Sequence, residues 1–298
     1  MIKASDAVFH TANYLLFGVF TFLCIYPFYY LFLVSVSNSL AVARAEVIFW
    51  PVGFTLATYR HVFQMEGIFR AFVISAARAG IGTALLLVVC SMFAFAVTKP
   101  FLPLRRVIYR GMVFTLYFYA GLIPWVVTMR MLQLNNTFLL YVLPTAVSGF
   151  AVVLIKTYIE SIPDSLQEAA LIDGAGYFTI YRTIIMPISI PILAAVSVFA
   201  AVGQWNAWQD NFFLVTNPRL QTIQLVLMRF LREAEMLANA IRQAQSISEV
   251  GAMADRRTLD PFTVRATISV ITIIPILLVY PFLQKYFVKG IMIGAIKG

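Results

Sequence analysis

Charge is the scarcest property of this 298-residue chain. Asp, Glu, Lys and Arg together make up 12% of the residues, against roughly 25% in soluble domains, whereas apolar residues make up 61%. So few charged side chains cannot cover a surface that faces water, and the composition therefore predicts an integral membrane protein. On such a chain, a formal net charge of +9 is more typical of cytoplasmic anchoring than of nucleic-acid binding.

Residues that hold metals or carry out catalysis are also scarce. Cys24 and Cys90 both lie in apolar runs, where a free thiol acts as a small hydrophobic group, and His10 and His61 are the only histidines. The sequence has no G-x-x-x-x-G-K-[ST] phosphate-binding motif and no Ser/His/Asp or Cys/His constellation. We therefore expect no enzymatic activity, no metal and no cofactor in this chain.

Long apolar runs dominate what is present. A membrane-spanning helix needs about 20 residues to cross a hydrocarbon layer of about 30 Å. Runs of this kind predict an all-α integral membrane protein, folded as one transmembrane domain over residues 1–298. The six predicted spans are about 13–37, 71–97, 107–129, 137–159, 188–205 and 266–286, with a loop at 160–187, a longer loop at 206–264 and a tail at 287–298.

The basic residues predict the orientation of these spans. Short loops rich in Lys and Arg stay in the cytoplasm. The segment after the second span holds Lys99, Arg105, Arg106 and Arg110, whereas the turn after the third span has only Arg130 beside it. We therefore expect the loop between the fourth and fifth spans and both termini to lie in the cytoplasm.

The predicted spans hold few ionisable groups. No span has an Asp or Glu near its middle, although carriers coupled to protons or sodium usually need such a carboxylate or a broken helix there. Pro27, Pro144 and Pro275 could break helices. Arg78, in the outer part of the second span, is the exception. Its side chain either extends to the outer interface or faces the pathway and attracts an anionic or hydroxylated substrate.

A short polar helix is predicted between the fourth and fifth spans. Pro163 disfavours helical conformation in the residue before it, and either Asp164 or Ser165 can cap a new helix. Ser165 and Glu168 have the spacing of a capping box, and Gly174 can stop the helix because it adopts positive φ without steric cost. These signals predict about ten helical residues, a rod of roughly 15 Å.

This segment resembles the EAA loop of ABC importer permeases. The matching pattern is Glu168–Ala170, three residues, Gly174, nine residues, Ile184, one residue and then Met186–Pro187, where the family usually has Leu in place of Met186. In that family the loop forms a coupling helix that sits in a groove of the cytoplasmic ATPase. The fuller pattern is similar to permeases of oligosaccharide importers. The resemblance assigns ATPase coupling to Glu168, Ala169, Ala170, Asp173, Gly174, Ala175, Pro187 and Pro191.

The segment after the fifth span is similar to the same permeases. Gly203–Trp208 reads Gly-Gln-Trp-Asn-Ala-Trp, and Gln224–Arg229 follows, with Thr222 where the family commonly has Pro. In the family this outer loop can reach into the cleft of the binding protein, and aromatic rings beside amides suit sugars. The tryptophans could equally be interfacial belt residues. The candidate contacts with substrate or binding protein are Arg78, Gln204, Trp205, Asn206 and Trp208.

The C-terminal tail also resembles the family. Its ending is Lys-Gly, a few residues, and then Gly-Ala-x-Lys-Gly, and in maltose-type relatives such a tail can enter the seam between two ATPase subunits. An alternative is a frayed basic end near anionic lipid. The resemblance assigns an ATPase contact to Gly294, Ala295, Lys297 and Gly298.

Taken over nearly the whole chain, the resemblance implies one permease subunit of an oligosaccharide ABC importer in the bacterial cytoplasmic membrane. The implied partners are a second permease subunit, two ATP-binding cassette subunits that hold ATP and Mg, an extracytoplasmic solute-binding protein and membrane lipid, with no nucleic acid. The alternative is an ion-coupled carrier or another polytopic membrane protein. An acidic oligosaccharide of the alginate or pectin type is favoured by Arg78 and by the outer arginines Arg44, Arg60, Arg70, Arg219 and Arg229.

Overall fold

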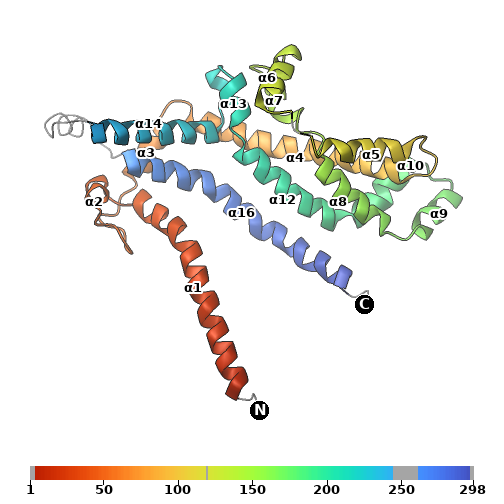
Figure 1. The fold of residues 1–298 in the computed structure, drawn as a ribbon, viewed down its shortest axis with the longest axis horizontal. Helices are drawn as coiled ribbons and strands as arrows, with labels where there is room; N and C mark the ends of the chain where they lie inside the picture. Colours follow the sequence, from red (N-terminus) through yellow and green to blue (C-terminus); the bar gives the residue numbers. More distant parts are fainter. Residues whose placement is uncertain (1–3, 119, 244–260, 296–298) are drawn as a thin grey trace. The chain divides into compact units, whose positions relative to one another are not determined.

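The computed structural model describes residues 4–118, 120–243 and 261–295, and these residues form helices and connecting turns without a β-strand (Figure 1). The chain divides into two compact units. Unit 1 consists of Met1–Ile68 and Leu227–Ile274, and unit 2 of Phe69–Val226 and Pro275–Gly298. The predicted all-helical class is therefore confirmed for the described residues.

Unit 1 is built around the end of a long helix. It contains α1 (Ala4–Ser35), α2 (Ser39–Ala43), α3 (Ala57–Gln64), the last part of α14 (Ile223–Gln243) and the first part of α16 (Pro261–Ala295). Leu33 and Val34 of α1 pack with Val42 and with Ala266 of α16 in a small core. The α1 residues before this core are mostly exposed and apolar, as expected of a helix that meets lipid or a partner.

Unit 2 holds most of the elements. They are α4 (Ile68–Thr98), α5 (Arg105–Thr115), α6 (Leu122–Met131), α7 (Leu139–Val142), α8 (Gly149–Glu160), α9 (Ser165–Ile172), α10 (Tyr177–Ile180), a π-helical turn (Tyr181–Ile185), α11 (Met186–Ile188), α12 (Ile190–Asn206), α13 (Gln209–Leu214), a 3-10 turn (Pro218–Leu220) and the start of α14.

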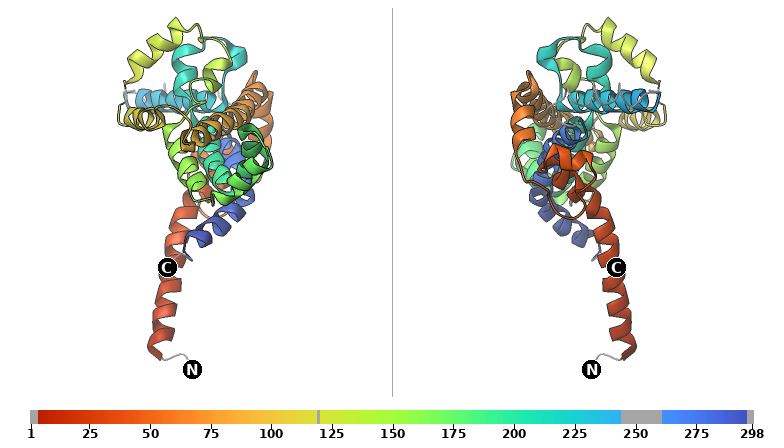
Figure 2. Two further views of the ribbon diagram at one scale, coloured as in Figure 1. Left: turned by 90° about the vertical axis from the view of Figure 1, so that its right-hand side faces the viewer. Right: turned by 90° about the vertical axis from the view of Figure 1, so that its left-hand side faces the viewer.

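Unit 2 has two apolar cores. The larger lies where α4, α8, the π-helical turn and α12 meet, and includes Cys90, Val152, Ile155 and Ile185, which are fully buried. The smaller core is formed by α6, α7 and the end of α13. In both views of Figure 2 the yellow-green α6 and the teal α13 lie side by side.

Among the described residues, three helical segments are long and apolar enough to cross a membrane: Phe9–Ser35, Ile68–Thr98 and Phe262–Val279. A fourth candidate is the pair Tyr177–Ile188 and Ile190–Asn206, which is bent by 78°. The predicted first, second and sixth spans therefore lie in continuous helices. Pro27 and Pro275 are accommodated inside α1 and α16 without interrupting them.

The predicted spans at 107–129 and 137–159 are broken. The first divides into α5 and α6, and Gly121 precedes α6 with a φ of +87°. The second divides into α7 and α8 around Pro144, which has no N–H to donate to a helical ladder. The new helix α8 is capped by Ser148, whose Oγ accepts a hydrogen bond of 3.3 Å from the Ala151 N–H. Six crossings therefore stay a prediction.

The pattern of charged and apolar residues at 231–250 predicts a solvated amphipathic helix within the loop at 206–264. It corresponds in part to α14, which begins earlier, at Ile223, and ends at Gln243. Residues 244–250 lie outside the described ranges. α14 begins earlier because Thr222 caps it: its Oγ1 accepts a hydrogen bond of 3.4 Å from the Leu225 N–H. The backbone N–H of Thr222 also donates to Asn211 Oδ1 over 3.4 Å, which a proline at this position could not do.

Candidate functional site

The predicted polar helix exists as α9, and its first turn differs from the expectation. Asp164 is the N-cap residue, and its carbonyl accepts hydrogen bonds of 2.9 Å from the N–H groups of Gln167 and Glu168. No side-chain cap is formed, so the predicted capping box of Ser165 and Glu168 is wrong. The reason is that Ser165 is already the first helical residue, so it does not occupy the cap position from which its hydroxyl could bond the third N–H.

The end of α9 is as predicted. Gly174 has a φ of +80°, and its N–H donates to the Leu171 carbonyl over 3.0 Å. The Ala175 N–H reaches back to the Ala170 carbonyl over 2.9 Å, which completes a Schellman motif. A residue with a Cβ in this left-handed conformation costs about 1–2 kcal/mol, so glycine sets the sharp end of this helix.

α9 has one face held by unit 2 and one face open. Ala170 and Ala175 pack against the larger core, whereas Glu168, Ala169 and Asp173 are exposed. Large apolar side chains of α9 are also exposed: Leu166 is 44%, Leu171 40% and Ile172 86% exposed. An exposed apolar edge beside a carboxylate is the composition of a protein-docking surface.

A buried lysine ties α9 to the C-terminal end of α4. Lys99 Nζ donates a hydrogen bond to Gln167 Oε1, and both residues are buried. The same ammonium lies 4.3 Å from the centroid of the Phe95 ring. Burial lowers the pKa of Lys99, and the nearby Asp164 carboxylate partly offsets this. Gln167 thus fixes which face of α9 meets unit 2.

Two prolines flank the bend that follows α9. Pro187 lies in α11 and Pro191 at the start of α12, where the missing N–H leaves no helical bond unmade, and the two segments meet at 78°. Tyr181, in the π-helical turn before the bend, forms a hydrogen bond of 2.7 Å between its hydroxyl and Ser91 Oγ on α4. The segment 165–185 is therefore joined to α4 at both Lys99 and Ser91.

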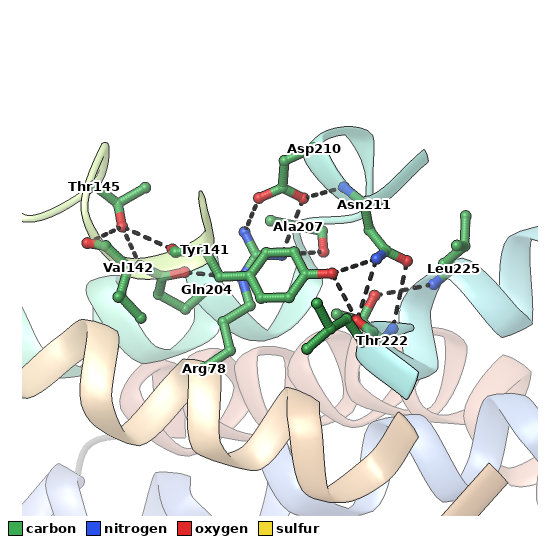
Figure 3. A network of polar contacts seen from close by, with 11 residues as sticks. Arg78, Tyr141, Val142, Thr145, Gln204, Ala207, Asp210, Asn211, Thr222 and Leu225 are labelled. Carbon is green, nitrogen blue, oxygen red and sulfur yellow. Dashed lines mark hydrogen bonds and ion pairs between the residues drawn. The ribbon is translucent and has the colours of Figure 1, made fainter. Parts of the chain in front are cut away.

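A second polar cluster lies in the N-terminal half of α4 and centres on Arg78 (Figure 3). Arg78 is 1% exposed. Its Nε donates to Gln204 Oε1 over 3.0 Å, and its Nη1 donates to the Ala207 carbonyl over 3.2 Å. Nη1 and Nη2 form a bidentate pair with the Asp210 carboxylate at 3.0 and 2.5 Å. The guanidinium carbon lies 4.7 Å from the centroid of the Tyr141 ring.

Asn211 and Tyr141 extend this cluster. The Tyr141 hydroxyl donates to the Leu220 carbonyl over 2.6 Å and accepts a hydrogen bond from the side-chain amide of Asn211 (Figure 3). On the neighbouring turn of α4, Ser75 Oγ accepts a hydrogen bond of 2.9 Å from the Ile223 N–H. Side chains of α4, α7 and α13 therefore satisfy the backbone groups of the segment that leads into α14.

The environment of Arg78 differs from both sequence expectations. The Arg78 side chain does not extend to an interface and is not open to a ligand. It is buried, and Gln204, Ala207 and Asp210 accept the hydrogen bonds of its guanidinium. The sequence reasoning missed Asp210 and Tyr141. A usable signal existed, since a buried cation needs a carboxylate, and Asp210 is the acid nearest to Gln204 in the sequence.

The remaining outer candidates differ in exposure and in their partners. Gln204 is buried and donates to Thr145 Oγ1 over 2.5 Å. Trp205 is buried, with its ring edge-on to Phe72 at 5.6 Å. Asn206 is exposed and accepts a hydrogen bond of 3.0 Å from Gln224. Trp208 is partly exposed and packs edge-on against Phe212, so the structure does not gather the two tryptophans on one surface.

Only part of the predicted tail contact is described. Gly294 and Ala295 form the last residues of α16, and Lys297 and Gly298 lie outside the described residues. Within the described ranges, no group of three His, Cys, Asp or Glu side chains has the geometry of a metal site.

Replacement of Gln167 tests the attachment of α9. Gln167→Leu leaves the buried Lys99 ammonium without its acceptor, and we expect a loss of roughly 1–3 kcal/mol in stability, seen as a lower thermal midpoint of the purified protein in detergent. Gln167→Glu supplies a carboxylate instead and is expected to preserve the midpoint. Ser165→Ala is the matched control, because Ser165 is exposed and caps nothing. A large loss in Ser165→Ala would show that its hydroxyl caps α9 after all.

No family model matches the chain. Among curated proteins it is 30% identical to "Polygalacturonan/rhamnogalacturonan transport system permease protein YtcP" of Bacillus subtilis over 280 residues, 94% of this chain and 95% of the relative. It is 29% identical to "Protein LplC" of the same organism, over 98% of this chain and 95% of that protein. It is also 26% identical to the arabinooligosaccharides transport system permease protein AraQ of Halalkalibacterium halodurans, over 95% of this chain and 94% of AraQ.

A solved structure has the same fold. A chain in the crystal structure of a bacterial ABC transporter involved in the import of the acidic polysaccharide alginate superimposes with a TM-score of 0.84 and 28% identity, covering 96% of this chain and 99% of that one. The sequence relatives and the structural neighbour agree over almost the full length. This chain therefore belongs to the family of permease proteins of carbohydrate ABC transport systems.

Proposed function

We propose that this chain is one of two permease subunits of a bacterial importer, and that α9 is the helix through which partner ATPases drive it. The observation that carries the proposal is the construction of α9. It is a short helix with an open face that includes Glu168, Leu171 and Ile172, a glycine-set end, and a buried attachment to the C-terminal end of α4 through Lys99 and Gln167. A helix that is exposed on one side and attached on the other can transmit a movement of the ATPase to α4.

Contacts between loops support the proposed topology of six crossings with both termini in the cytoplasm. Lys99, in the basic loop predicted to be cytoplasmic, contacts Gln167 of α9, which is predicted to lie on the same side. Asn136, in the turn predicted to be outside, accepts hydrogen bonds of 2.7 and 3.0 Å from the N–H groups of Thr216 and Asn217 in the predicted outer loop. Segments predicted to lie on the same side of the membrane thus contact each other.

The proposed mechanism is alternating access. Two ATP-binding cassette subunits hold ATP and Mg, and their closure moves α9. Glu168 meets a basic residue of the ATPase, Gly174 sets the end of the helix, and Pro187 and Pro191 keep the bend by which α9 leads into α12. The tail that includes Gly294 and Ala295 enters the seam between the ATPases. A second permease subunit and membrane lipid cover the apolar faces, and a solute-binding protein delivers the substrate.

Aspartate substitutions at two nearby glycines test this role of α9. Gly174→Asp puts a side chain where φ is +80°, and we expect normal amounts of protein in the membrane but loss of oligosaccharide uptake in cells. Gly176→Asp is the matched control: it adds the same charge two residues away, at an ordinary φ of −71° and at the N-cap of α10, where aspartate is favoured.

Two results would contradict the assignment. One is full uptake by cells that carry Gly174→Asp, and the other is equal loss in both variants, which would trace the effect to charge and not to the shape of α9. Affinity purification gives an independent check. A permease is expected to bring down an ATPase and a second permease, whereas an ion-coupled carrier would bring down neither.

We further propose that the substrate is an acidic oligosaccharide. The supporting observations are that a relative is named for transport of polygalacturonan and rhamnogalacturonan, and that the structural neighbour belongs to an ABC transporter involved in the import of the acidic polysaccharide alginate. Exposed arginines in segments predicted to be outside include Arg44, Arg60, Arg70 and Arg219, although Arg44 lies 3.9 Å from the Glu46 carboxylate. Arg78 no longer belongs to this set, because its charge is paired with Asp210.

Competition between unlabelled sugars tests the substrate class. In cells that express the full importer, uptake of a labelled oligogalacturonate is expected to be inhibited by unlabelled oligouronates and to be unaffected by neutral maltooligosaccharides of the same length. Equal inhibition by the neutral sugars would overturn the acidic assignment. It would leave the permease assignment in place.

A further inference from the structure

The Arg78 cluster connects segments that are far apart in the sequence and is closed to solvent. We call the contacts of Arg78 with Gln204, Ala207 and Asp210 the Arg78 joint. Arg78 comes from α4, Gln204 from the end of α12 and Asp210 from α13, and the hydrogen-bonded pairs are separated by 126 and 132 residues in the sequence. The clearest sign of a close fit is at Gly82 on α4, where a Cβ would lie 2.6 Å from Gln204 Nε2. With Arg78 1% exposed, the cluster leaves no room for a ligand at the guanidinium.

A joint of this kind is not the simplest way to stabilise a protein. A buried ion pair loses the hydration of both charges, and apolar residues of similar volume often stabilise as well or better. What the pair provides is one permitted geometry, because a bidentate guanidinium–carboxylate contact fixes both distance and orientation. The pair is therefore suited to holding α13 in a fixed position on α4, and not only to stabilising the fold.

The joint fixes the short segment at 207–222. Besides Arg78, the segment is held by Tyr141, which donates to the Leu220 carbonyl, and by Asn136, which accepts from Thr216 and Asn217. Its outward side chains include Phe212 and Phe213, which are 42% and 39% exposed. The segment therefore has little freedom to move without α4.

The other end of α4 carries the attachments of α9. Ser91 bonds to Tyr181 and Lys99 to Gln167, and both partners belong to the segment that begins with α9. α4 is one continuous helix between Arg78 and Lys99, without proline, so the two ends lie about 30 Å apart along a stiff rod. All of these residues belong to unit 2.

We propose that Arg78 and Asp210 are positioning residues that link the 207–222 segment to α4, so that an event at this segment is transmitted along α4 to α9. This inference rests on the proposed function, in which the segment is outside and α9 meets the ATPase. Loss of the pair disconnects the 207–222 segment from α4 without removing any group that touches substrate or ATPase.

The decisive variant removes both charges at once. Arg78→Met alone leaves a buried carboxylate without its cation, and Asp210→Leu alone leaves a buried guanidinium, so both single variants are expected to lower the thermal midpoint. The double variant Arg78→Met with Asp210→Leu leaves no unpaired charge and is expected to recover most of the midpoint; the remaining difference is the cost of the Gln204 amide oxygen and the Ala207 carbonyl, which lose a donor. It cannot recover the fixed geometry. Stability and positioning thus separate in one variant.

The measurement is ATP hydrolysis by the transporter, purified with its partner subunits in lipid nanodiscs, with and without its solute-binding protein loaded with an oligogalacturonate. In the double variant we expect unchanged basal hydrolysis. We expect its stimulation by the loaded binding protein to be about fivefold or more below that of the original protein, in the range typical of coupling between sites.

The control is Lys156→Met with Glu160→Leu. It removes an ion pair of the same 2.5 Å length within α8, where Glu160 is exposed, and is expected to leave the stimulation intact.

The outcomes separate this inference from the function on which it rests. If the original complex is not stimulated at all, the proposed function fails. If the original complex is stimulated and the stable double variant is stimulated equally, the permease assignment stands and the pair is shown to be structural only. If the control pair reduces stimulation as much as the Arg78 pair does, the effect is not specific to the joint and the inference is overturned.

Discussion

Buried charge is the constraint on which unit 2 depends. A chain with 12% charged residues has few ionic groups to place, and two of them are buried on α4 or next to it: Arg78 in its N-terminal half and Lys99 directly after its last residue. Each must find an acceptor within the protein, because apolar surroundings offer none. Asp210 and Gln167 provide these acceptors, and they bring α13 to one end of α4 and α9 to the other. The positions of both segments follow from this requirement.

The same need for satisfied polar groups explains how the chain tolerates broken helices. Each break leaves N–H and C=O groups without helical partners. At the start of α8 the Ser148 hydroxyl accepts from Ala151, and the Ser148 N–H lies 3.3 Å from Cys90 Sγ. At the end of α9 the Schellman motif satisfies the orphan carbonyls of Ala170 and Leu171. The breaks occur where side chains or glycine geometry can complete the backbone hydrogen bonding.

Conservation of fold at low identity fits this picture. The structural neighbour shares 28% of its residues with this chain, yet the TM-score is 0.84. Apolar residues of similar volume can replace one another with small energetic cost, so the packing of an apolar core tolerates many sequence differences. Thr222 illustrates how a local change is accommodated, because its N–H and hydroxyl both take part in the hydrogen bonding around the start of α14.

The sequence alone determined the features that consecutive residues encode. The long apolar helices, the stop at Gly174 and the bend flanked by Pro187 and Pro191 all follow from local hydrophobicity and backbone preference. Only the tertiary structure decided the partners of Arg78, the attachment of Gln167 and the breaks in the third and fourth predicted spans. The physical reason is that a buried charge is satisfied by whichever acceptor folding brings near it. For Arg78 that acceptor lies 132 residues away, a distance over which no spacing rule operates.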